Sequence, residues 1–239
     1  EDERGRNRPA LPFSLAWRAG DGFLDFSLRD VDAVAFSPLV KRLRGWKPAG
    51  KIDFGILVEG GRAKLDLAVR DLEFASKEGD ISGKAIAFTL NAGAERNSAG
   101  WHWKARLDWP QGEFFRAPWR RQAGVRMEAE GDLTDAMLEV GLARLDVAGT
   151  GGVTAGLRWD RARGEATDWG FITDRLDLAA ALRDWLQPWL TSLGLPEWQA
   201  AGHARFSAEW KTGELRRFYA GLEETRLADG TGHIELDGV

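Results

Sequence analysis

The side chains best suited to catalysis are few in this chain and lie far apart. Its three histidines, His102, His203 and His233, each fall in or beside a segment with strand-like alternation. Nucleophilic catalysis needs a base beside a nucleophile, and no GxSxG context accompanies any of them. The sequence also lacks cysteine and the HxH, HExxH and DxDxDG patterns that hold metal ions. We therefore expect no catalytic residue, no metal site and no cofactor.

Two further patterns bear on chemistry. The glycine cluster Gly149–Gly152 lacks the lysine and the helix that follow a phosphate-binding loop, so a turn is predicted there. Paired carboxylates, as in glycoside hydrolysis, come together only in space, and no spacing selects a pair among the 37 acidic residues. A carbohydrate-active enzyme therefore stays open as a less favoured alternative.

The segment Phe114–Arg121, FFRAPWRR, is the sharpest local feature. Arginine forks bind phosphate, and tryptophan or phenylalanine can lie at a lipid or base interface. A solvated turn whose arginine stems cover Trp119 is the favoured alternative. The whole stretch Pro110–Gln122 is predicted to be a loop.

Composition excludes some partners. With 33 basic and 37 acidic residues the net charge is −4, so no global field attracts nucleic acid, and no nucleic-acid partner is expected. No run approaches the roughly 20 apolar residues of a membrane-spanning helix. The chain starts without methionine and ends within a strand-like pattern. We expect a flexible leader at 1–10 and, at 11–239, a β-rich fragment of a longer repetitive protein.

Period-two alternation dominates and predicts a long antiparallel meander. It is clearest at Trp101–Trp109, where tryptophan, alanine and leucine alternate with charged residues, so one face is apolar and the other solvated. The phase slips at Arg70–Leu72 and at Leu142–Ala143, which would exchange the faces unless a bulge absorbs each slip. A crossover with a short helix near Leu39–Leu43 is predicted between Phe36 and Gly50.

One stretch, Asp177–Leu193, has a helical rhythm instead. Its large apolar residues form one stripe, with Asp177 as a predicted N-cap and Gly194 as the residue that ends the helix. Pro188 predicts a kink near Trp185–Gln187 or two short helices meeting there. This helical insertion, 174–196, either packs on the sheet to close a core or serves as a lid or plug for an open apolar groove.

Three stretches carry a resemblance to a known family. They are the turn Gly79-Asp-Ile-Ser-Gly83, the block Leu176–Leu186, and the strand start Ala201-Gly-His-Ala-Arg-Phe-Ser-Ala. Together with the succession of short strands and glycine turns over Lys51–Val239, they resemble the AsmA-like and TamB-like envelope proteins of Gram-negative bacteria, a bridge-like lipid transfer group. The family supplies no catalytic residues.

The residue patterns predict a mainly β protein with one main helix near 177–193, and the resemblance implies that its antiparallel sheet is long and curved, an open trough or half-barrel. It implies that an apolar groove binds or conducts acyl chains of phospholipid or another lipid between the inner and outer membranes. It also implies a periplasmic location, anchored to the inner membrane through a segment outside this chain. The groove candidates are Leu65, Leu67, Val69, Phe88, Trp101, Trp103, Leu107, Val153, Leu182, Trp185, Leu186 and Trp189.

A structural or partner-binding β-domain with a closed core is the alternative. A lipid conduit predicts an apolar face that stays open, whereas a structural domain predicts that its own helix closes the same face.

Overall fold

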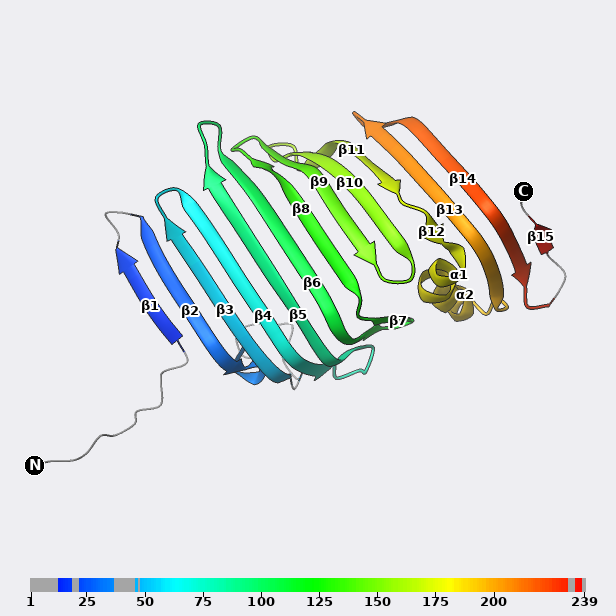
Figure 1. Cartoon of the computed structure of the whole chain (residues 1–239), viewed down its shortest axis with the longest axis horizontal. Coiled ribbons are helices and arrows are strands. Elements are labelled where there is room, and N and C mark those ends of the chain that lie inside the picture. Colours follow the sequence, from blue (N-terminus) through cyan, green and yellow to red (C-terminus); the bar gives the residue numbers. More distant parts are fainter. Residues whose placement is uncertain (1–12, 19–21, 37–45, 47, 232–234, 238–239) are drawn as a thin grey trace, which may run out of the picture.

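A computed structural model describes residues 13–18, 22–36, 46, 48–231 and 235–237. These residues form one antiparallel sheet of 15 strands, in the order β1-β2-β3-β4-β5-β6-β8-β9-β10-β11-β13-β14-β15, with β7 paired to β6 and β12 to β13. The first and last strands lie at opposite ends of the sheet, which therefore stays open (Figure 1). The predicted mainly β, open antiparallel fold is confirmed.

The strands and helical segments have the following bounds. The strands are β1 (Phe13–Arg18), β2 (Phe23–Asp32), β3 (Ala49–Glu59), β4 (Arg62–Ala75), β5 (Ile81–Arg96), β6 (Trp101–Arg116), β7 (Trp119–Gln122), β8 (Val125–Leu133), β9 (Met137–Val147), β10 (Gly151–Asp160), β11 (Glu165–Thr173), β12 (Leu176–Asp177), β13 (Trp198–Lys211), β14 (Glu214–Asp229) and β15 (Glu235–Asp237). The helical segments are the 3₁₀ turn η1 (Ala33–Phe36), α1 (Leu178–Ala181), the π-helical turn η3 (Leu182–Leu186) and α2 (Gln187–Ser192).

Two sequence-based assignments were wrong. The predicted loop Pro110–Gln122 is a hairpin, because β6 continues to Arg116 and pairs with β7 across a turn that contains the cis peptide Ala117–Pro118. Strand β11 was not predicted at all, although Trp169 and Phe171 alternate there with Gly170. The leader 1–10 and the predicted helix near Leu39–Leu43 lie outside the described residues.

β-Bulges absorb the predicted phase slips. Between β4 and β5 the register shifts after Val69, where Asp71 has a positive φ of 49°, and Leu72 then pairs with Ile86. On the neighbouring strand Gly50 leaves the necessary room, since a Cβ there would lie 2.6 Å from the Asp71 carbonyl oxygen. In β9 the extra residue is Gly141, beside the predicted slip. The bulges therefore keep the apolar side chains on one face along the full strands.

The helical segment starts and ends as predicted. Asp177 accepts a hydrogen bond from the Ala180 amide at 2.8 Å, which caps α1, and Gly194 follows the last turn with φ of 73°. Pro188 lies at the start of α2, directly after the π turn η3. A proline cannot donate to the preceding turn and its ring clashes with the residue four positions earlier, so the wider π turn relieves that conflict. The predicted irregularity is confirmed.

Candidate functional site

One continuous apolar face runs across the sheet, and the strand candidates lie on it. Cross-strand partners share a face in an antiparallel sheet, so the pairings place the candidates of β4, β5, β6 and β10 on the same side. These are Leu65, Leu67, Val69, Phe88, Trp101, Trp103, Leu107 and Val153. The register thus brings together eight residues that the sequence separates by up to 88 positions.

A row of alanines crosses the middle of this apolar face. The registers pair one alanine with the next through five adjacent strands: Ala92, Ala105, Ala129, Ala143 and Ala155. With strands about 4.8 Å apart, the row is about 19 Å long. Larger side chains flank it on both sides, among them Trp103 with Leu157 and Leu107 with Leu145. Most flanking side chains therefore stand higher than the alanines, although the row that contains Trp103 also includes Gly131.

The apolar face is not a closed interior. Among the described residues, no large side chain is fully buried, and the apolar residues that are nearly covered include small ones such as Ala33, Ala204 and Ala208. The side chains of Trp101, Trp103 and Trp109 are only partly buried, and no second sheet among the described residues packs on them. Towards the ends of the sheet the exposure rises, to 71% for Trp17 and 62% for Phe218.

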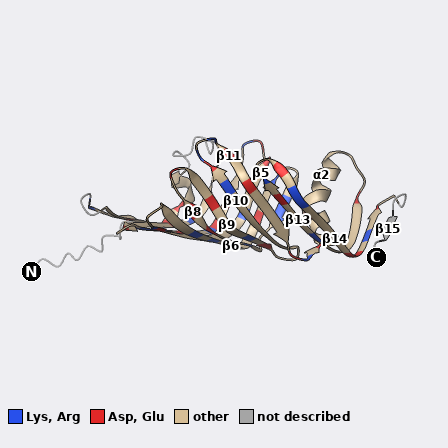
Figure 2. Cartoon of the chain, turned by 90° about the horizontal axis from the view of Figure 1, so that it is seen from above, with Lys and Arg blue, Asp and Glu red and all other residues tan. Residues whose placement is uncertain are grey.

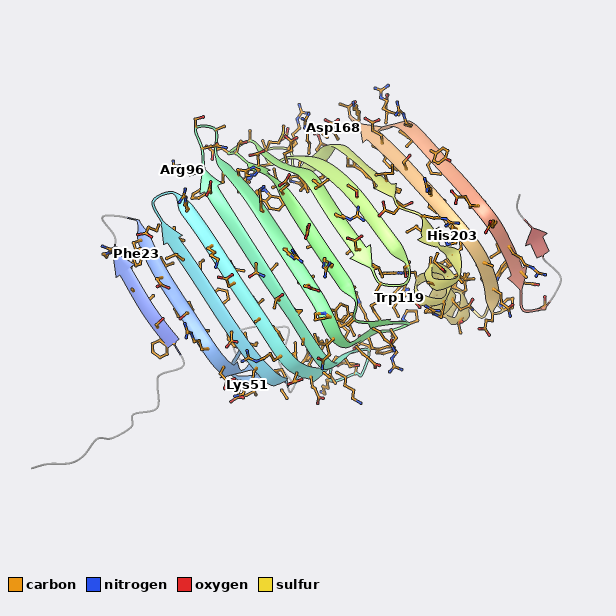
Figure 3. All side chains as sticks on the ribbon, viewed as in Figure 1. Phe23, Lys51, Arg96, Trp119, Asp168 and His203 are labelled. Atoms are coloured by element: carbon orange, nitrogen blue, oxygen red, sulfur yellow. The ribbon has the colours of Figure 1, made fainter. Side chains whose placement is uncertain are left out.

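The helical segment covers only one end of the apolar face. It contacts β7, β12 and β13 at the lower strand ends in the view of Figure 1, and Figure 2 shows α2 to one side of the sheet. Trp119 and Arg121, which share a face with Phe114, bind the π turn: Trp119 Nε1 donates to the Trp185 carbonyl oxygen at 2.9 Å. Figure 3 shows Trp119 beside the helical segment. The helix therefore does not close the face.

The four candidates on the helix have different surroundings. Leu182 is buried, at 8% exposure, whereas Trp185, Leu186 and Trp189 are about half exposed, at 49%, 47% and 45%. The predicted apolar stripe therefore buries one side on the sheet and presents the rest to solvent.

Charged residues occupy the opposite face and pair across the strands. Between β6 and β8 four pairs follow one another, at nitrogen–oxygen distances of 3.0–3.6 Å: His102 with Asp132, Lys104 with Glu130, Arg106 with Glu128 and Asp108 with Arg126. The predicted apolar and polar phases of β6 are therefore confirmed. Such exposed pairs contribute at most about 1 kcal/mol each, but they favour this register of β6 against β8.

Two hollows lie among the charged-face residues. One of about 950 Å³ is lined by residues of β3 to β9, among them the charged-face residues Lys64, Gly93 and Lys104. A second of about 650 Å³ lies around Gly156 and Gly170. Because glycine has no side chain, it leaves a gap between the long charged side chains around it, and these gaps form the hollows.

A charged cluster at the lower end of this face has a perturbed carboxylate. The Asp30 backbone amide donates to Asp53 at 2.6 Å, and Arg70 pairs with the other oxygen of the same carboxylate. The amide hydrogen bond, followed by the Arg70 guanidinium, holds the pKa of Asp53 below its usual value. Because each group has a partner of opposite charge, the cluster stabilises the ends of β2, β3 and β4.

The histidines that could take part in catalysis do not form a common site. His102 Nδ1 lies 3.1 Å from Asp132 on the charged face, and His203 lies beside the start of the helix (Figure 3), with Nδ1 buried and without a described hydrogen bond. His233 lies outside the described residues. The described residues contain no group of three histidine or acidic side chains placed to hold a metal ion. Within the same residues, no helix is long and apolar enough to cross a bilayer.

Comparison with known proteins adds no assignment. No protein-family model, no curated protein and no solved structure matches this chain.

Proposed function

We propose that this chain is a segment of a cell-envelope protein, as the AsmA-like and TamB-like resemblance implies, and that its apolar face binds phospholipid acyl chains and conducts them between the two membranes. The observation that carries the proposal is the continuous apolar face, most of which no described element covers. Large contiguous exposed apolar patches mark sites that bind another protein, a membrane or a ligand. A periplasmic location and an inner-membrane anchor outside this chain belong to the same proposal.

The alanine row favours an acyl chain as the occupant. A bilayer hydrocarbon core is about 30 Å thick, so one acyl chain spans about 15 Å, close to the length of the row. Trp103 and Leu107 stand on either side of Ala105, and Met127 stands beside Ala129 on the next strand. A linear chain along the row would thus gain contacts from both sides, and each buried methylene contributes about 0.8 kcal/mol.

The test places a charge in the row. Ala105→Glu puts a carboxylate where the acyl chain is proposed to lie, so binding should fall at least about tenfold, since moving a charge against hydrocarbon costs more than the 1.4 kcal/mol that a factor of ten requires. Binding is measured by quenching of tryptophan fluorescence with phosphatidylcholine that carries brominated acyl chains. Ala68→Glu, on the charged face, is the matched control and should bind like the parent.

Two results would overturn the proposal. One is a parent protein that neither retains phospholipid in native mass spectrometry nor is quenched by brominated chains. The other is a stable dimer of the parent protein. If the Ala129→Cys variant then forms cross-links between the two copies at this position, the apolar face serves assembly.

A further inference from the structure

A polar hollow lies at the lower strand ends, where β7, the turn after β9 and the π turn η3 meet. Its volume is about 560 Å³, and three of its lining residues are arginines. The lining residues are Arg120, Arg121, Gln122, Ala123, Ala148, Arg183 and Asp184. Two arginines come from the FFRAPWRR segment and the third from the helix, 62 residues further along the chain, so only the fold brings them together.

The hollow has more hydrogen-bond donors than acceptors. Arg121 Nη1 donates to Asp184 at 2.9 Å, Arg183 Nε donates to the same carboxylate at 2.8 Å, and Arg120 pairs with Glu113. Each guanidinium has five N–H donors, and the described side-chain hydrogen bonds use one from each. The Arg121 Nε is buried and has no partner among the described residues. A ligand rich in acceptor oxygens matches this surplus.

The hollow has unused hydrogen-bond donors but only a small excess of positive charge. Asp184 and Glu113 offset two of the three positive charges, and Asp177 acts on Arg183 from farther away. Arg120 and Arg183 keep side chains that are 66% and 71% exposed, so both can turn towards a ligand.

Apolar surface adjoins the hollow directly. The Arg121 guanidinium lies 6.0 Å from the Trp185 ring centroid, and Trp119 holds the backbone of Trp185 in place. Leu186 and Trp189 continue the half-exposed surface from there. Donors for an anion therefore stand next to a surface for hydrocarbon.

We infer that this arginine hollow binds a phosphate ester group, and that the ester belongs to a phospholipid whose acyl chains lie on the adjoining apolar surface. Guanidinium groups bind phosphate through paired, charge-assisted hydrogen bonds, and phosphate oxygens can accept from several arginines at once. The inference rests on the proposed function, because it assigns the headgroup of the same ligand.

The experiment compares ligands that differ by the phosphate. Dioctanoyl phosphatidic acid, dioctanoylglycerol and inorganic phosphate are each titrated into the full chain by calorimetry. The parent should bind phosphatidic acid about tenfold more tightly than dioctanoylglycerol, in line with one or two charge-assisted hydrogen bonds. Arg120→Gln/Arg183→Gln should remove that preference and leave the affinity for dioctanoylglycerol unchanged. The matched control is Arg62→Gln/Arg158→Gln, two exposed, ion-paired arginines of the charged face, and should keep the preference.

The outcomes separate the two proposals. Equal binding of phosphatidic acid and dioctanoylglycerol by the parent, or an equal loss in both double variants, overturns the phosphate site while acyl binding stands. Arginine-dependent binding of inorganic phosphate without binding of either lipid supports a site for free phosphate and overturns the lipid source together with the proposed function. Absence of binding by all three ligands overturns both.

Discussion

The two faces of this sheet are built from alternate residues of the same strands, yet different forces stabilise them. On the charged face, cross-strand partners such as Lys104 and Glu130 form ion pairs in contact with solvent, so this face needs no covering layer. On the apolar face, Trp103 and Leu107 have only their neighbours to cover them, because most of the face has no second layer. The charged face of the sheet is therefore stable in water, whereas most of the apolar face lacks a covering layer. The contrast points to the apolar face as the surface that binds a ligand or partner.

The strongest test of this contrast concerns the helical segment, which covers one end of the apolar face. Leu182→Asp should bury an uncompensated charge beneath the helical segment, since Leu182 is 8% exposed, and should destabilise the protein by about 3–5 kcal/mol. Leu186→Asp, one turn further and 47% exposed, should cost less than about 1 kcal/mol. Urea unfolding followed by circular dichroism measures both. Equal losses would mean that the helix covers the face more completely than the structure indicates.

A second test compares glycines on the two faces. Gly131→Ala puts a Cβ 1.9 Å from the Glu139 carbonyl oxygen, so the backbone of β8 or β9 must move, at a cost of about 1–3 kcal/mol. Gly93→Ala, on the charged face, has its nearest neighbour at 3.9 Å and should be neutral. The difference in urea midpoint between the two variants measures this effect. A tolerated Gly131→Ala would contradict the close approach of β8 and β9.

A third test measures how much a side chain on the open face contributes. Removing a buried aromatic costs about 3–5 kcal/mol, but Trp103 is only partly buried, so Trp103→Ala should cost about 2 kcal/mol or less. Thermal unfolding of the parent and the variant, without added lipid, gives the value. A loss above about 4 kcal/mol would indicate that the face is closed in solution.

The smallest expected effect concerns the charged face and depends on pH. The pKa of Asp53 is lowered in the folded state, so its carboxylate contributes stability above the unfolded pKa, near the ordinary value of 3.8, and this contribution disappears as the pH falls through the folded pKa. Asp53→Asn should therefore lower the melting temperature at pH 7 by the equivalent of about 1 kcal/mol or less, and should have a smaller effect at pH 2. An equal effect at both pH values would assign the loss to packing.

Local sequence patterns correctly predicted one strand, a bulge and the two ends of the helical segment. Alternation at Trp101–Trp109 gave both phases of β6, and the slip at Arg70–Leu72 marked a bulge. Asp177 and Gly194 marked the ends of the helix. The hairpin over 110–122 was missed because Pro110, Gly112 and Pro118 suggested a loop, whereas the pairing of β6 with β7 overrides that local signal.

The sequence by itself determined that the chain forms strands with one apolar and one charged face, because side chains in a strand alternate with a period of two whatever lies around them. Only the tertiary structure decided that the apolar face stays largely uncovered, that five alanines align into one row, and that Arg183 joins Arg120 and Arg121 at one hollow. Those outcomes depend on strand order, on register across bulges and on where the helix packs. Each of these is set by contacts between residues far apart in the chain, which no local pattern encodes.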